Sequence, residues 1–170
     1  VVLAFAVVLP SAFGQINVLT NKMDNARTGQ NTAETLLTIS NVTPNRFGKQ
    51  FATSVDGYIQ AQPLYMSALT VNGATRNVVF VATLHNSVYA IDADTGAQLW
   101  QVNFGASVPS ATEGCSGVTG FNEIGILSTP VIDAVTKTMY VTAKTYAGGV
   151  AAYSLHAIDV TTGQEKFGGP

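Results

Sequence analysis

The chain has 170 residues, of which 46% are hydrophobic and 11% are charged, with 8 Lys and Arg against 10 Asp and Glu. This balance, with a pI near 5.5, provides no basic surface for a phosphate backbone, so nucleic acid is excluded as an expected partner. The composition is that of a globular protein.

Residues 1–14 have the pattern of a truncated signal peptide. Residues 1–9 are an unbroken apolar run, Pro10 breaks it, and Ala12 and Gly14 place small residues before a cleavage site. The run is too short to cross a bilayer, so no membrane span is expected. The alternative is a buried N-terminal strand. We favour export, which predicts a secreted or periplasmic protein.

Residues 15–57 form a predicted entry segment. Residues 21–31 are polar, with little apolar periodicity, and this favours a loop. Phe47 to Val55 is predicted to be a strand, and Phe51 stands where later segments carry an aromatic residue.

Residues 58–104 predict an antiparallel sheet joined by tight turns. The expected strands are Tyr58–Leu69, Val78–Leu84, Val88–Ile91 and Gln98–Phe104. The two middle strands are apolar without alternation, which predicts that both faces of the sheet are covered.

Residues 105–127 follow as a long loop rich in Gly, Ser and Thr. Structureless connections longer than about 12 to 15 residues are often functional. Residues 128–170 then predict a second sheet. Its expected strands are Ser128–Asp133, Thr138–Lys144, Tyr153–Val160 and a last one from Glu165 onward.

The two predicted sheets contain a repeated sequence motif. The stretch A-I-D-A-D-T-G-A-Q-L-W at Ala90–Trp100 aligns with A-I-D-V-T-T-G-Q-E-K-F at Ala157–Phe167, and Pro63 aligns with Pro130 at the same offset. Motif positions that keep their residues and spacing while the loops between them vary in length are typical of a repeat architecture. The shared positions are Ala90, Asp92, Thr95, Gly96 and Trp100, and then Ala157, Asp159, Thr162, Gly163 and Phe167.

The pattern A-x-D-x-x-T-G-x-x-x-W resembles the tryptophan-docking motif of quinoprotein β-propellers, the pyrroloquinoline-quinone (PQQ) dehydrogenases and their non-catalytic relatives. The resemblance covers residues 47–170 and implies an all-β fold of radial four-stranded sheets, or blades, in which the motif aromatic wedges between neighbours. About two blades are expected here, in an incomplete ring whose edges and faces need further blades as partners. The chain is therefore expected to be a fragment. The strand at Phe47–Val55 would complete the last blade or cap the first.

Chain order places several loops on one face without reference to any family. The connections after the second and fourth strands of each sheet share one side, because neighbouring strands run antiparallel. The candidate binding residues on that side are His85, Glu113, Cys115, Asn122, Glu123 and Tyr146.

Each candidate also has a structural interpretation. Glu113 and Glu123 have two interpretations: each is a metal ligand or a general base, or each only accepts hydrogen bonds from backbone N–H groups of the loop. Cys115 is the only cysteine and is either paired with a cysteine outside this chain or buried, while a nucleophilic role is disfavoured because no acid and His accompany it. His85 is expected to be solvated in its turn. No metal-ligand spacing is present, so no metal is predicted.

Two classes of function follow. The first is a secreted, non-enzymatic platform whose loop face binds a protein, a glycan or a small molecule. The second, implied by the resemblance, is an alcohol or sugar dehydrogenase that uses PQQ with Ca²⁺. Its alcohol-oxidising branch carries adjacent cysteines where this chain has Cys115-Ser116, and the only Trp here belongs to the repeat motif. The cofactor is therefore unknown, and the binding platform is preferred.

Overall fold

The computed structural model describes residues 16–113 and 120–170, and the predicted signal peptide and Cys115 lie outside these residues. The fold is all-β, as the sequence predicts, with antiparallel sheets of four and three strands that do not close into a ring. Within the described part of the chain there is no helix long and apolar enough to cross a membrane.

The first sheet contains β1 (Leu64–Val71), β2 (Ala74–Ala82), β3 (Ser87–Asp92) and β4 (Gln98–Asn103), in that order. A two-residue turn at Asn72-Gly73 joins β1 to β2, with positive φ at both residues, as a type I′ hairpin requires. The first strand begins at Leu64 and not at Tyr58 as predicted, because β2 ends its pairing with β1 at Phe80 opposite Leu64.

The Asp-x-x-Thr-Gly motif forms the turn between β3 and β4. The carboxylate of Asp92 accepts hydrogen bonds from the backbone N–H groups of Asp94 and Thr95, both at 3.0 Å. Gly96 closes the turn with a φ of 76°, which a side chain would strain. Gly163 holds the corresponding place after Asp159, with a φ of 73° and a bond from its N–H to the Asp159 carbonyl.

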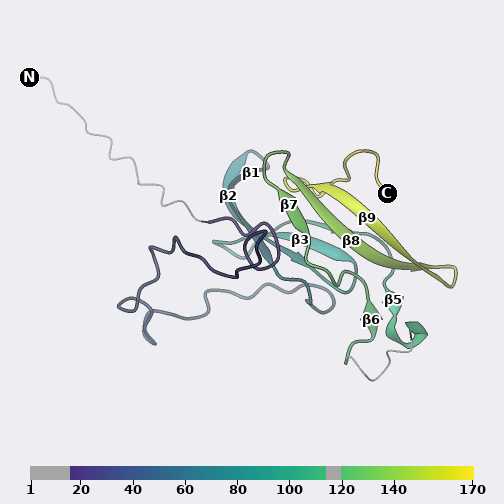
Figure 1. Ribbon diagram of the computed structural model, residues 1–170, viewed down its shortest axis with the longest axis horizontal. Helices are drawn as coiled ribbons and strands as arrows, with labels where there is room; N and C mark the ends of the chain where they lie inside the picture. Colours follow the sequence, from purple (N-terminus) through teal and green to yellow (C-terminus); the bar gives the residue numbers. More distant parts are fainter. Residues whose placement is uncertain (1–15, 114–119) are drawn as a thin grey trace, which may run out of the picture.

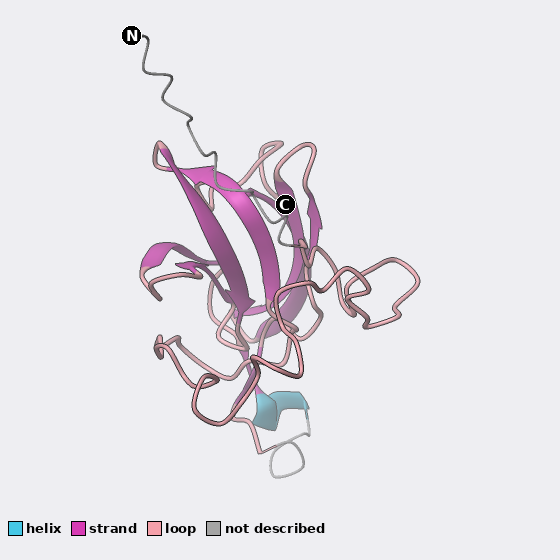
Figure 2. Cartoon of the chain, turned by 90° about the vertical axis from the view of Figure 1, so that its left-hand side faces the viewer, coloured by secondary structure: helices cyan, strands magenta, loops and turns pink. Residues whose placement is uncertain are grey.

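The second sheet contains β7 (Val131–Asp133), β8 (Thr138–Ala147) and β9 (Val150–Asp159). Between the sheets, β5 (Val108–Pro109) pairs with β6 (Glu123–Ile124), and a single turn of 3₁₀ helix, η1, spans Ser110–Glu113. Figure 2 shows this helical turn at one end of the molecule, away from the main body of strands.

Two strand predictions were wrong. The fourth strand expected from Glu165 reduces to one bridge with Ile158, because Gly168 and Gly169 adopt positive φ and turn the chain away. Residues 47–55 form no strand. Phe51 instead packs on the Gly96 turn, where a Cβ added to that glycine would lie 2.6 Å from the Phe51 ring, and Thr53 Oγ1 donates to the Gly96 carbonyl at 2.7 Å.

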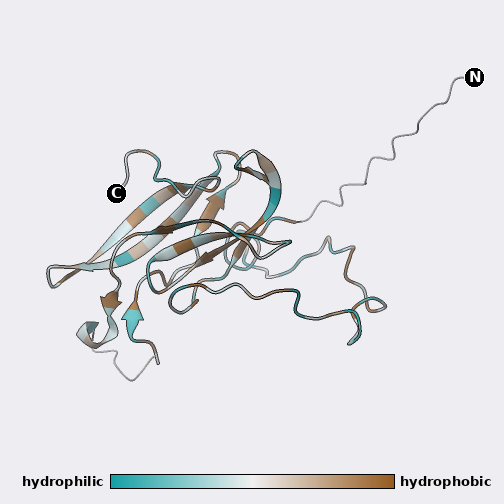
Figure 3. Cartoon of the chain, turned by 180° about the vertical axis from the view of Figure 1, so that it is seen from behind, coloured by the Kyte–Doolittle hydropathy of each residue, from teal (hydrophilic) through white to brown (hydrophobic). Residues whose placement is uncertain are grey.

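The two sheets share one hydrophobic core, and β7, β8 and β9 lie across β1 to β4 (Figure 1). Side chains alternate along a strand, so each sheet presents one apolar row to the other. Figure 3 colours the residues by hydropathy and shows apolar segments along the strands. The first sheet contributes residues such as Phe80, Val88 and Ala90, and the second contributes Met139 and Ile158, all at most 2% exposed.

Trp100 lies at the seam between the sheets. Its ring covers Gly163, where an added Cβ would lie 2.7 Å from the indole, and its Nε1 donates to the Val160 carbonyl at 3.1 Å. It also contacts Phe80, with ring centroids 5.8 Å apart. Phe51 on Gly96 and Trp100 on Gly163 thus repeat one arrangement, an aromatic ring on the glycine turn that follows it in the chain.

The N-terminal segment joins the first strands of both sheets. Val18 pairs with Tyr65 of β1, with both backbone bonds at 2.9 Å, and the Leu19 carbonyl accepts the N–H of Ile132 in β7 at 2.8 Å. The predicted entry loop is therefore tied to the sheets at these two residues.

Candidate binding face

One end of the two sheets carries the loops that the sequence groups together, and we call it the loop face. It consists of residues 56–62, the β2–β3 turn at residues 83–86, the linker 105–127 where described, and the β8–β9 turn. Backbone bonds join these pieces: Leu84 N–H to the Tyr58 carbonyl at 2.8 Å, and Tyr146 N–H to the Ala106 carbonyl at 2.8 Å. The loop face is thus a connected surface and not a set of separate loops.

Three polar side chains of the loop face contact one another. His85 Nδ1 lies 2.8 Å from Glu123 Oε2, and Ser107 Oγ donates to the same oxygen at 2.6 Å. The His85 side chain is 51% exposed, whereas that of Glu123 is 19% exposed. The carboxylate therefore holds the linker against the β2–β3 turn while the imidazole stays open to solvent.

This cluster does not have the geometry of a nucleophile and its base. A catalytic serine donates to the histidine, with the acid on the far side of the ring. Here Ser107 and His85 both contact Glu123. Among residues 16–113 and 120–170, no group of three or more His, Cys, Asp and Glu side chains could hold a metal ion.

Asp56 forms a second anchor of the loop face. Its carboxylate accepts the hydroxyls of Thr83 at 2.8 Å and Ser87 at 2.5 Å, and its N–H donates to the Tyr89 hydroxyl at 3.1 Å. The Asp56-Gly57 pair predicts a turn from sequence, but the hydroxyls that it meets come from residues about 30 positions away.

Asn86 connects the loop face to the second sheet. Its side chain is completely buried, and Nδ2 donates to the carbonyls of Lys144 at 2.8 Å and Gly105 at 3.3 Å. Its φ of 59° lies in the left-handed region, which Asn tolerates better than most residues. Gly125 packs so closely that an added Cβ would lie 2.2 Å from the Leu84 carbonyl oxygen.

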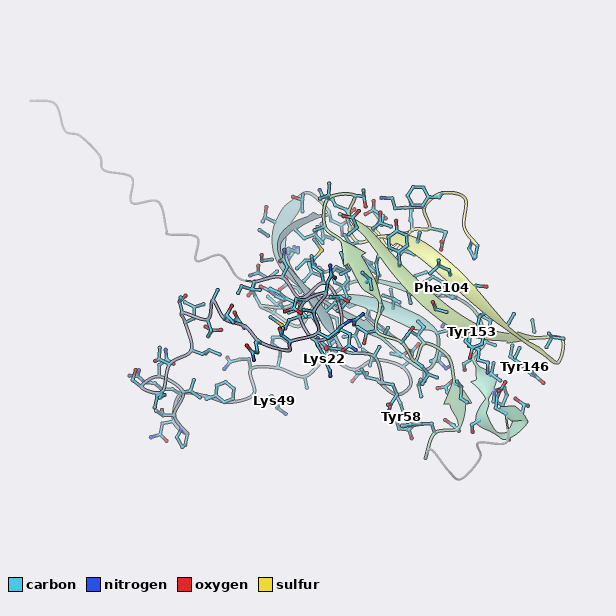
Figure 4. All side chains as sticks on the ribbon, in the orientation of Figure 1. Lys22, Lys49, Tyr58, Phe104, Tyr146 and Tyr153 are labelled. Atoms are coloured by element: carbon cyan, nitrogen blue, oxygen red, sulfur yellow. The ribbon has the colours of Figure 1, made fainter. Side chains whose placement is uncertain are left out.

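The remaining candidates lie around the linker and the β8–β9 hairpin. Glu113 forms an ion pair with Lys144 at 2.8 Å, and this hydrogen bond raises the pKa of the lysine. The Asn122 carbonyl accepts the N–H of Ser110 at 3.1 Å. Tyr146 lies on the hairpin that also carries Tyr153 (Figure 4). The ring of Tyr58 contacts that of Phe121 in a tilted arrangement, with centroids 4.8 Å apart and an interplanar angle of 58°.

A polar pocket opens where the first strands of both sheets begin. It measures about 470 Å³ and is lined by Asn21, Arg27, Gln60, Gln62, Leu127, Ser128 and Thr129. The Gln62 N–H donates to Thr129 Oγ1 at 3.0 Å, and Lys22 N–H donates to Gln62 Oε1 at 2.9 Å. Arg27 is the charged side chain in this lining, so the pocket presents a cation together with amides and hydroxyls.

The repeat-motif residues lie away from this pocket, at the opposite ends of the strands. Asp92 forms an ion pair with Arg76 at 2.6 Å, and this hydrogen bond is the main cause of its lowered pKa. Asp159 bonds the N–H of Thr161 at 2.7 Å, and Thr162 Oγ1 accepts the N–H of Gln164 at 3.2 Å. Ala157 pairs with Tyr140 in the β8–β9 ladder, and Phe167 is 77% exposed.

The His85 side chain provides a local pH probe of the loop face. Its pKa is raised, chiefly by the hydrogen bond to Glu123. A folded-state pKa above the unfolded value of about 6.5 means that the contact stabilises fully below that pH and is lost as pH rises through the folded pKa. We expect an NMR titration of His85 to show its pKa falling in Glu123→Gln, with no change in Glu113→Gln. An unchanged pKa in Glu123→Gln would contradict the contact.

Comparison with known proteins gives one partial match. The chain is 39% identical over 69 residues to quinate/shikimate dehydrogenase (quinone) of Acinetobacter baylyi, which is 41% of this chain and 8% of that protein. No protein-family model matches, and no solved structure matches. The chain therefore spans a small part of the relative that it resembles, and the likeness to a PQQ quinoprotein is distant and partial.

Proposed function

We propose that this chain supplies two blades of an exported, PQQ-like β-propeller that acts as a rigid binding platform. Its ligand is a small polar anion held in the pocket lined by Arg27. The observation that carries the proposal is the pocket itself, because its lining combines Arg27, whose Nη1 donates to the Asn21 carbonyl at 3.2 Å, with the amides and hydroxyls of residues at the start of both sheets. Planar guanidinium groups recognise carboxylates with two parallel hydrogen bonds.

The internal repeat supports further blades as partners. Leu64, Phe80 and Val88 are at most 2% exposed because the second sheet covers them. Their counterparts in the repeat, Val131, Tyr140 and Leu155, are 44%, 39% and 63% exposed. The register agrees, since Leu64 pairs with Phe80 as Val131 pairs with Tyr140. A third sheet of the same kind would cover this outer face and place its glycine turn beneath Phe167.

A second candidate function is quinone-dependent oxidation of a hydroxylated substrate. It is supported by the 39% identity to quinate/shikimate dehydrogenase (quinone). PQQ is a planar quinone that carries carboxylates, so the donors around Arg27 suit it. Ca²⁺ prefers several oxygen ligands that include carboxylates, and this pocket has no carboxylate in its lining. The residues present therefore fit the anion but do not fit Ca²⁺, and no catalytic step follows from them.

The test is a calorimetric titration of the protein with PQQ, with quinate and with shikimate, each with and without Ca²⁺. The platform proposal expects saturable binding of at least one of these anions that weakens at least tenfold in Arg27→Ala, since a bond between charged groups contributes about 1.5–3 kcal/mol. Arg46→Ala, which removes an arginine outside the pocket, is the matched control.

Dye reduction distinguishes the two candidates. Substrate-dependent reduction of an electron-acceptor dye in the presence of PQQ would establish the dehydrogenase. Binding without dye reduction would support the binding platform. If none of the three anions binds, the pocket is not their site.

A further inference from the structure

A single peptide group holds two of the side chains that line the anion pocket. The carbonyl of Asn21 accepts a hydrogen bond from Arg27 Nη1 at 3.2 Å. The N–H of Lys22 belongs to the same peptide group and donates to Gln62 Oε1 at 2.9 Å. The carbonyl and the N–H of a trans peptide point in opposite directions. Arg27 and Gln62 are therefore bound at opposite edges of this peptide group.

Gln62 also connects the pocket to the start of the second sheet. Its backbone N–H donates to Thr129 Oγ1 at 3.0 Å. Gln62 and Thr129 occupy the same place in the repeat, directly before Pro63 and Pro130. The three segments that line the pocket, residues 21–27, 60–62 and 127–129, are thus joined by a continuous series of hydrogen bonds.

The direction of these bonds decides which atoms remain for a ligand. A backbone N–H can only donate, so the Gln62 atom that faces Lys22 is the oxygen, and the two hydrogens of Nε2 are not used there. Thr129 Oγ1 accepts from Gln62, so its hydroxyl hydrogen also remains. Within residues 16–113 and 120–170, neither Gln62 Nε2 nor the Thr129 hydroxyl donates to another group of the protein. Both side chains therefore offer donors to the pocket.

The charge of the pocket agrees with these donors. Arg27 lines the pocket, and none of the lining residues is Asp or Glu. Asp24 lies on the same loop as Arg27, and its carboxylate accepts hydrogen bonds from the N–H of Thr28 at 3.1 Å and from the Thr28 hydroxyl. An ammonium group in the pocket would therefore meet a cation and further donors, whereas an oxygen would meet compatible groups.

We propose that Gln62 determines the ligand class of this pocket by selecting carboxylates that carry an oxygen on the adjacent carbon, as in α-hydroxy and α-oxo acids. The proposal rests on the proposed anion-binding function and names the class of anion. Arg27 binds the carboxylate, and Gln62 Nε2 donates to the second oxygen. The peptide group between them holds both side chains in place before the ligand arrives, which lowers the ordering cost of binding. The ammonium of an α-amino acid faces donors at the same point and is rejected.

The first test is a calorimetric titration with mandelate, phenylacetate and phenylglycine. These acids share one carbon skeleton and differ at the carbon beside the carboxylate, which carries a hydroxyl, no substituent or an ammonium. Mandelate is expected to bind about two- to tenfold more tightly than phenylacetate, the effect of one hydrogen bond between neutral groups. Phenylglycine is expected to bind about tenfold more weakly than mandelate or worse, because its ammonium has no acid to pair with.

Two substitutions of Gln62 test the residue itself. Gln62→Met removes the amide, and mandelate and phenylacetate are then expected to bind equally. Gln62→Glu keeps an oxygen for the Lys22 N–H and replaces Nε2 with a second carboxylate oxygen. It is expected to reverse the preference, so that phenylglycine binds more tightly than mandelate. Gln50→Met changes an exposed glutamine outside the pocket and is the matched control. Melting curves check that each variant is folded.

The outcomes separate this proposal from the one on which it rests. Equal binding of mandelate and phenylacetate by the wild type, or a preference that survives Gln62→Met, would overturn the role of Gln62 and leave the Arg27 anion site standing. If mandelate and phenylacetate do not bind, and PQQ, quinate and shikimate do not bind either, both proposals are wrong. A reversed preference in Gln62→Glu would support the proposal, since a purely structural role of Gln62 does not exchange one ligand for another.

Discussion

Replacing Trp100 with alanine is expected to lower the free energy of unfolding by about 3–5 kcal/mol, as for other large aromatic residues removed from a packed site. The indole fills the seam between the sheets, covers Gly163 and donates to the Val160 carbonyl. Its loss leaves a void against Phe80 and an unpaired carbonyl. Urea denaturation followed by circular dichroism measures the change.

Trp100→Phe separates packing from hydrogen bonding. It keeps an aromatic ring over the glycine and removes the Nε1 donor, so a loss of about 1 kcal/mol is expected. Gly163→Ala tests the same seam from the other side, because its Cβ would lie 2.7 Å from the indole and its φ is 73°. In Trp100→Ala the ring is absent and Gly163→Ala should cost less, so the two changes should be non-additive. Additive losses would mean that the ring does not rest on the turn.

Asn86→Asp is expected to destabilise the protein by about 3 kcal/mol or more, the cost of burying a charged group without partners. The amide nitrogen of Asn86 donates to the carbonyl oxygens of Lys144 and Gly105. The carboxylate of an aspartate has no hydrogen to donate, so its oxygens would repel these two carbonyl oxygens. The group is completely buried, so water does not relieve the repulsion. Thermal unfolding above neutral pH, where the new carboxyl would tend to ionise, measures the effect.

Asn86→Gly is the matched control for backbone conformation. Glycine adopts the φ of 59° at least as readily as Asn, so this variant keeps the backbone conformation and loses the hydrogen bonds and the packing of the buried side chain. It is expected to be destabilised less than Asn86→Asp. Equal stability of wild type and Asn86→Gly would show that these bonds do not hold the β2–β3 turn against β8.

The strands and motif turns were predictable because their signals are local. Apolar runs bounded by polar turns identify β2 and β3, and Asp92 with Gly96 makes its turn from bonds within five residues. Residues 47–55 misled for the same reason. Their β-forming side chains favour a strand. In the structure Phe51 packs against the turn at Gly96, and the segment does not pair with a neighbouring strand.

The loop face was predictable in outline but not in its contacts. The antiparallel order of the strands places the loops that carry His85 and Glu123 on one side of the sheets. In the structure His85 Nδ1 lies 2.8 Å from Glu123 Oε2. The His85 side chain is exposed, as the sequence predicts, but its contact with Glu123 was not predicted. The sequence does not predict the partners of Ser107 and Asp56 or the pocket beside Arg27, because these contacts bring together residues from distant segments.

The attachment of the N-terminal segment has a consequence for the order of folding. Each sheet is built from neighbouring hairpins that close over short loops, whereas the bond from Ile132 to Leu19 joins residues about 110 positions apart and carries a larger loop-closure cost. The hairpins are therefore expected to form first and residues 18 and 19 to dock last. The same bonds are expected to open first under mild denaturant, so the attachment of residues 18 and 19 to the two sheets is expected to be the first part of the fold that is lost.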